Sequence, residues 1–136
     1  MIRSIVKDPI FLSRKSAPAT AADRSVAQDL RDTLMANTDK CVGMAANMIG
    51  ETKRVIVFLD GSTPVVMFNP EILAADGEFE TEEGCLSLTG TRHTKRYSRV
   101  KVRYQDERFV RRVKDLTGWT AQIIQHEVDH CNGILI

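Results

Sequence analysis

Residues 126–130 read His-Glu-Val-Asp-His, near the end of a chain of 136 residues. If this stretch is helical, His126 and His130 project from one face, because residues four apart in an α-helix are neighbours. Two imidazoles so placed can bind one divalent metal, and Glu127 between them can reach a water molecule on that metal. The alternative interpretation is a helix with two histidines on a polar face and no metal.

The surrounding sequence favours a helix. Thr117 is a suitable N-cap, the segment from Trp119 to Cys131 contains neither Pro nor Gly, and Gly133 stands where a left-handed residue commonly follows a helix. The residues three and four positions before the first histidine share its face. We therefore expect two further side chains to line the cavity that the metal faces: Ile123 and Gln122.

A catalytic zinc-type site commonly has three protein ligands and an open position for water. Residues 82–87 read Glu-Glu-Gly-Cys-Leu-Ser and offer Cys85, which follows an acidic, strand-like run. A lone cysteine is more often a small buried apolar residue than a ligand. Both interpretations of Cys85 remain open from this residue alone.

Taken together, residues 82–87 and residues 125–130 (Gln-His-Glu-Val-Asp-His) resemble the peptide deformylase family closely. The resemblance implies an α+β fold with antiparallel β-sheets packed around the metal-binding helix. It implies that three side chains bind the metal and that Glu127 is the general acid and base. The implied ligands are Cys85, His126 and His130. The implied activity is removal of the N-formyl group from the N-terminal methionine of nascent polypeptides.

A third signature of the family has the pattern G-φ-G-φ-A-A-x-Q-φ-G, where φ is apolar. Residues 41–50 read Cys-Val-Gly-Met-Ala-Ala-Asn-Met-Ile-Gly, so the first Gly is replaced by Cys41 and the Gln by Met48. In the family, that glutamine amide donates a hydrogen bond to the developing oxyanion, which a thioether cannot do. Asn47 could donate, but neighbouring side chains generally point in different directions. We therefore expect reduced activity, or else a metal-containing protein that binds peptides without turnover or with altered specificity.

The resemblance also implies the remaining contacts. The backbone N–H of Leu86 would donate to the oxyanion, and the methionine side chain would enter an apolar pocket. The residues expected at this pocket are Val42, Gly43, Trp119, Gln122 and Ile123. Arg92 matches an arginine that follows the cysteine motif in the family, although Thr89 replaces the usual intervening proline. The alternative for Arg92 is a surface charge in a basic patch with Arg96 and Arg99.

A Cys/His/His ligand set suits iron, zinc or nickel, and affinity order alone does not decide among them. The resemblance implies Fe²⁺, with Zn²⁺ or Ni²⁺ as alternatives. A zinc peptidase of the HExxH type is a competing function. Cys85 argues against it, because such peptidases use His or Glu as the third ligand.

Composition restricts the function further. The net charge is +1, with acidic and basic residues nearly balanced, so no nucleic-acid or anionic-membrane partner is implied. The expected partner is an N-formylmethionyl peptide or nascent chain. Three cysteines without a CxxC motif, and no signal-peptide or membrane-spanning pattern, predict a cytoplasmic protein. The length predicts a single domain over residues 1–136.

Periodicity predicts the other elements. We expect an irregular arm over residues 1–22, a helix over 23–35 and a hairpin of strands 54–59 and 64–68 that ends at Asn69-Pro70. An extended acidic segment, 78–83, should lead to Cys85. A second hairpin should turn through 105–108, and residues 134–136 are expected to form a short packed strand.

Overall fold

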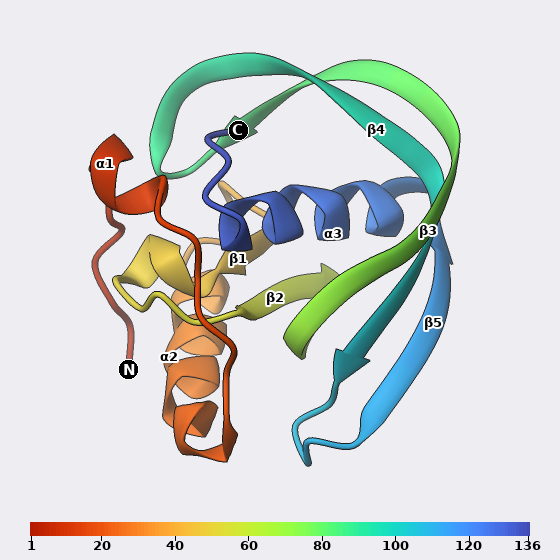
Figure 1. The fold of residues 1–136 in the computed structure, drawn as a ribbon. Helices are drawn as coiled ribbons and strands as arrows, with labels where there is room; N and C mark the ends of the chain where they lie inside the picture. The colour runs from red at the N-terminus through yellow and green to blue at the C-terminus, as the bar shows by residue number, and fades with distance from the viewer.

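The computed structural model describes residues 1–136 and has one sheet of five antiparallel strands in the order β1-β2-β3-β4-β5 (Figure 1). The strands are β1 (Gly43–Ala45), β2 (Val55–Asp60), β3 (Thr63–Cys85), β4 (Leu88–Gln105) and β5 (Arg111–Thr117). The helices are α1 (Pro9–Leu12), α2 (Arg24–Met35) and α3 (Gly118–Cys131), with 3₁₀ turns η1 (Ala21–Asp23) and η2 (Ala46–Ile49). The predicted α+β class is confirmed.

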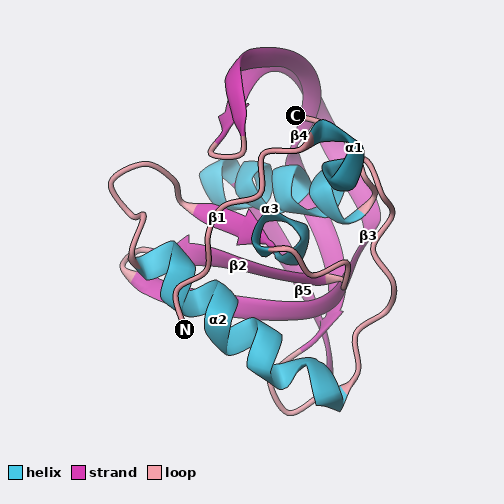
Figure 2. Ribbon diagram, turned by 90° about the vertical axis from the view of Figure 1, so that its left-hand side faces the viewer, coloured by secondary structure: helices cyan, strands magenta, loops and turns pink.

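Strand β2 separates two apolar cores. Its side chains alternate between the two faces of the sheet, as in any strand. Val55 and Val57 pack with α2, whereas Ile56 and Phe58 pack with α3. In Figure 2, β2 lies between these two helices. Helix α2, which matches the helix expected over residues 23–35, buries one apolar face: Val26, Ala27, Leu30 and Leu34.

The long hairpin of β3 and β4 bends around α3 (Figure 1). The prediction that the strand ends at Asn69-Pro70 is wrong, because β3 continues to Cys85. The strand pairing shifts register between Phe68 and Glu71, and Asn69 adopts a positive φ of 52° there. A bulge of this kind tolerates proline and increases strand bending. Instead of ending the strand, the Asn-Pro pair begins the curve that carries Cys85 over α3.

Helix α3 begins and ends where the sequence predicted. Thr117 is its N-cap in an extended conformation, and Gly133 has a φ of +74° just beyond its end. The N–H groups of Gly133 and Ile134 donate back to the carbonyls of His130 and Asp129. Residues 134–136 do not form the predicted strand, since the N–H of Ile134 is used at the helix terminus, but the end of the chain is packed, with Ile136 buried.

The N-terminal arm is irregular as predicted, apart from α1 and η1. Leu12 is fully buried and Ile5 packs against the α2 core, whereas Ile2 and Ile10 remain exposed. The N–H of Ser16 donates to the carbonyl of Cys131 at 2.9 Å. The arm therefore lies against the end of α3.

Replacing Gly133 by Ala should destabilise the chain. A left-handed φ costs a residue with a Cβ roughly 1–2 kcal/mol, and a Cβ at this position would also clash with the backbone carbonyl of Ser13. The control is Gly61→Ala, where φ is +62° but no atom lies within 4 Å of the added Cβ. Chemical denaturation should give a larger loss of unfolding free energy for Gly133→Ala. Equal losses would contradict the proposed contact.

Candidate metal centre

Three potential metal ligands lie together at one end of the β3–β4 hairpin. Cys85 is the last residue of β3, and His126 and His130 lie on successive turns of α3. One ligand atom from each lies within 4.8 Å of the others, and the two histidine Nε2 atoms are 3.0 Å apart. Tetrahedral coordination with ordinary Zn–N and Zn–S bonds places ligand atoms roughly 3.3–3.8 Å apart. The separation of the two histidine atoms is a few tenths of an ångström below this range, so the donor set fits one metal ion after a small adjustment of the rings.

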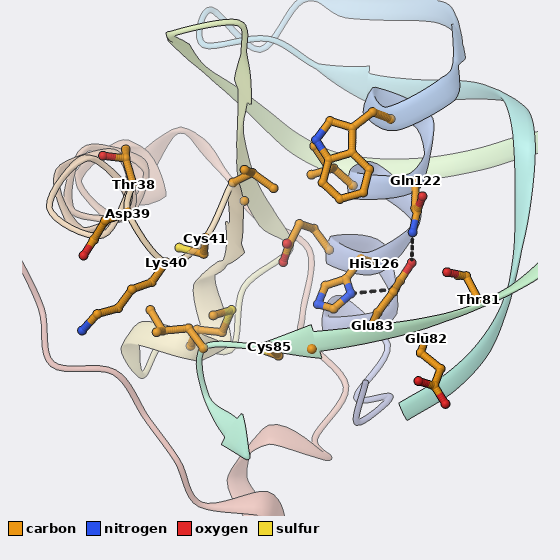
Figure 3. Close-up of a pocket in the computed structure, with 18 of the residues that line it drawn as sticks. Thr38, Asp39, Lys40, Cys41, Thr81, Glu82, Glu83, Cys85, Gln122 and His126 are labelled. Atoms are coloured by element: carbon orange, nitrogen blue, oxygen red, sulfur yellow. Dashed lines mark hydrogen bonds and ion pairs between the residues drawn. The ribbon is translucent and has the colours of Figure 1, made fainter. Parts of the chain in front are cut away.

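A buried carboxylate orients the first of the two histidines. Oε1 of Glu83, from β3, lies 2.8 Å from Nδ1 of His126. Gln122 donates from Nε2 to the other oxygen at 2.8 Å, as Figure 3 shows. Arg96 donates to Glu83 through Nε and Nη2, and to Asp129 through Nη1 at 2.6 Å. With Nδ1 engaged, His126 presents Nε2 to the metal position.

Arg96 is only 3% exposed, so its interpretation as part of a surface basic patch is wrong. The partner that explains it, Glu83, is part of the cysteine motif but was not singled out from the sequence. The signal that could have indicated this ion pair was the charge of the two strands, because β3 is rich in acidic residues and β4 in basic residues. Pairing of these strands brings their side chains together. In the strand pairing, Arg96 lies opposite Phe79, yet its side chain bonds to Glu83, four residues further along β3. This placement depends on the folded shape of the hairpin, which the sequence does not reveal.

The charges of this cluster follow from burial and hydrogen bonding. Burial alone would raise the pKa of Glu83, but hydrogen bonds from His126, Arg96 and Gln122 outweigh it and lower the pKa to about 2. Burial opposes protonation of His126, yet Cys85 and Glu83 raise its pKa to about 10. Burial and the neighbouring His126 charge lower the pKa of His130 to about 3. A metal bound at Nε2 of His126 would therefore displace a proton from the imidazolium.

Glu127 lies beside the three ligands and is almost fully buried. Its Oε1 atom has no hydrogen-bond partner, and burial raises the pKa of the carboxyl group to about 7. Gly43 packs directly against it, since a Cβ there would lie 2.9 Å from both Glu127 Oε2 and Ile123 Cγ2. The absence of a side chain at Gly43 gives this carboxyl group its space. A carboxyl poised near neutral pH is suited to proton transfer.

Two of the three ligands, Cys85 and His126, line a cavity of about 910 Å³, whereas His130 is buried and not part of its lining. Its walls include seven residues that the sequence assigned to the oxyanion or substrate contacts: Val42, Gly43, Met48, Leu86, Trp119, Gln122 and Ile123. Its lining also includes Cys41, the first residue of the third signature, and three residues that the sequence did not indicate: Thr38, Asp39 and Lys40. Arg92 does not line the cavity. Its side chain is partly buried, and its Nη1 atom has no hydrogen-bond partner.

Met48 lines the cavity and is buried, whereas Asn47 does not line it. The Asn47 amide donates to the carbonyls of His130, at 3.0 Å, and Leu12, at 3.4 Å. Asn47 therefore holds the end of α3 and does not supply the donor that Met48 lacks. The N–H of Leu86, in the turn between β3 and β4, makes no hydrogen bond within the chain.

Known proteins match the chain along its whole length. The polypeptide deformylase family model matches residues 2–136. The peptide deformylase of Clostridium beijerinckii is 54% identical over 136 residues, all of both chains. A crystal structure of peptide deformylase from Thermotoga maritima superposes with a TM-score of 0.88 and 33% identity, covering 99% of this chain and 95% of that one.

A further solved structure contains a bound peptide. The Met-Ala-Ser-bound class I type b peptide deformylase from Acinetobacter baumannii superposes with a TM-score of 0.87 and 31% identity. The match covers 99% of this chain and 97% of that one.

An α+β fold that clusters a cysteine and two histidines beside a buried glutamate, at the wall of one cavity, defines a class of metal-dependent hydrolases. Within that class, the chain belongs to the polypeptide deformylase family, metalloenzymes that remove the N-formyl group from nascent peptides. None of its helices has the length and apolar character needed to span a membrane.

Replacing Cys85 by Ala should remove the metal, because two histidines alone leave the site without its thiolate ligand. We expect about one metal ion per chain in the wild type and much less in Cys85→Ala, measured by elemental analysis of purified protein. Cys41→Ala is the matched control, since Cys41 lines the same cavity but is not part of the ligand cluster. Full metal content in Cys85→Ala would refute the assignment of Cys85.

Proposed function

We propose that this chain deformylates N-formylmethionyl peptides with a metal held by Cys85, His126 and His130. The observation that carries the proposal is the convergence of three ligand atoms beside a buried glutamate at the wall of one cavity. The Met-Ala-Ser peptide in the Acinetobacter baumannii structure supports a peptide that begins with methionine. We propose that the reaction takes place in the cytoplasm, where nascent chains emerge.

A divalent metal bound there would lower the pKa of a water molecule and polarise the formyl carbonyl. The Cys/His/His donor set accommodates iron, zinc or nickel, and the family resemblance favours Fe²⁺. Gly43 leaves room for Glu127, and Glu83 keeps Nε2 of His126 directed at the metal position.

We assign proton transfer to Glu127. Its carboxylate would take a proton from the attacking water and later deliver one to the departing amine. A pKa of about 7 allows the group to do both near neutral pH. The free N–H of Leu86 would donate to the oxyanion as the carbonyl becomes tetrahedral.

We place the methionine side chain against the cavity wall formed by Val42, Gly43, Gln122 and Ile123. Trp119 is 61% exposed and would contact the substrate at the rim. Because Arg92 lies outside the cavity lining, we assign it to a more distant part of the peptide.

A second candidate function is peptide binding with slow or no turnover. Met48 favours it, because this buried thioether lies where the family has an amide donor, and the neighbouring Asn47 amide is engaged elsewhere. Formate release from a formyl-Met peptide, measured with metal content on the same sample, separates the two functions.

Replacing Glu127 by Gln should leave the metal in place and abolish most turnover, because the amide cannot accept the proton. General acid–base catalysis contributes about a hundred- to ten-thousand-fold in rate. Glu82→Gln is the control, since Glu82 is an exposed carboxylate on the same cavity. Loss of metal from Glu127→Gln, with metal restored in Glu127→Asp, would make Glu127 a metal ligand instead.

Replacing Met48 by Gln should raise kcat while leaving peptide affinity nearly unchanged, because the added donor acts on the oxyanion and not on the ground state. One oxyanion donor contributes on the order of a hundred- to a thousand-fold. Met48→Leu is the control: it keeps the volume, adds no donor and should stay slow. An ordinary fast rate in the wild type, or no gain in steady-state kinetics from Met48→Gln, would contradict the assigned role.

A further inference from the structure

Helix α3 presents three polar side chains at one-turn intervals to the β3–β4 hairpin. These are Gln122, His126 and Asp129, and each is bonded to the ion pair of Glu83 and Arg96. Residues four and three apart lie on one helical face, so the stripe is continuous. Only His126 among the three belongs to the ligand cluster.

The Glu83 carboxylate spans the first two turns of this stripe. Oε1 lies 2.8 Å from His126 Nδ1, and Oε2 accepts from Gln122 Nε2 at 2.8 Å. Arg96 also donates to both oxygens, with Nε 3.0 Å from Oε2, so Gln122 shares the fixing of this carboxylate with Arg96. Gln122 makes the shorter bond to Oε2 and helps set the orientation in which Glu83 holds the His126 ring, which decides whether Nε2 points at the metal.

Gln122 is placed differently from the other partner of Glu83. Arg96 is buried away from the cavity, whereas Gln122 is half-buried and lines it. A cavity wall that receives only an apolar methionine side chain does not require the amide of Gln122. A polar group beside a buried site needs a hydrogen-bond partner, and Glu83 is the partner of this amide. Figure 3 shows the amide nitrogen of Gln122 directed at Glu83.

We propose that Gln122 is a positioning residue for the metal centre: acting through Glu83, it fixes the His126 ring and strengthens metal binding. This role is separate from any contact that Gln122 makes with the substrate. It rests on the proposed function only in taking His126 as a metal ligand.

The first test measures zinc affinity by competition with a chromophoric chelator. Gln122→Leu removes the donor at similar volume and should weaken zinc binding by about threefold to tenfold. Glu83→Gln should weaken it by about tenfold to a hundredfold, the usual effect of losing a carboxylate partner of a ligating histidine. Trp119→Leu is the matched control on the same cavity wall, because Trp119 has no bond to Glu83, and its zinc affinity should equal that of the wild type.

The second test needs no activity and separates positioning from simple destabilisation. The chain contains three histidines, so ¹⁵N-histidine NMR of the zinc-loaded protein can resolve each ring. In Gln122→Leu, the Nδ1 proton of His126 should exchange with water faster than in the wild type, while the ring signals of His130 stay unchanged. A uniform change in both rings would indicate general loosening and overturn the proposal.

Wild-type zinc affinity and unchanged His126 exchange in Gln122→Leu, with a raised KM for formyl-Met peptide, would overturn the inference and leave Gln122 as a pocket wall only. Failure of the proposed function would give a different set of zinc-binding results. In that case the wild-type chain would bind no zinc, or Cys85→Ala and Glu83→Gln would both bind zinc like the wild type.

Discussion

The buried ion pair between Glu83 and Arg96 is the interaction on which the rest of the site depends. It joins adjacent strands of the long hairpin and, through His126 and Asp129, attaches both strands to α3. Removing one partner of a buried pair typically costs roughly 3–5 kcal/mol, because the other charge is left uncompensated. The pair therefore holds the hairpin on the helix, and the same carboxylate orients His126, which we propose as a metal ligand.

The fold supplies this arrangement by burying β2 on both faces. One apolar core packs α2 on one side of the sheet and a second packs α3 on the other, and Ala45 of β1 belongs to the second core. This packing holds β1 against α3 at Gly43, where β1 approaches Glu127 so closely that no side chain fits. Cys85 reaches the same point from the far end of the bent hairpin.

Much of the site could be predicted because its signals are local. The histidine spacing on α3 follows from helical geometry, and its N-cap and terminal glycine stand at fixed offsets. The course of β3 could not be predicted, because the bulge at Asn69 depends on a hydrogen bond to Gln105, far along the chain. Arg96 was misread for the same reason: its burial results from strand pairing and curvature, which a charge pattern does not reveal.

The central claim is that one metal ion is held by Cys85 and by Nε2 of both His126 and His130, with Glu83 at Nδ1 of His126. A crystal structure of the metal-loaded protein, with anomalous data collected at the absorption edge of the metal, tests it most directly. The account predicts one strong anomalous peak within bonding distance of Cys85 Sγ and the two Nε2 atoms. A peak bonded through Nδ1 of His126, or one located away from Cys85, would contradict it.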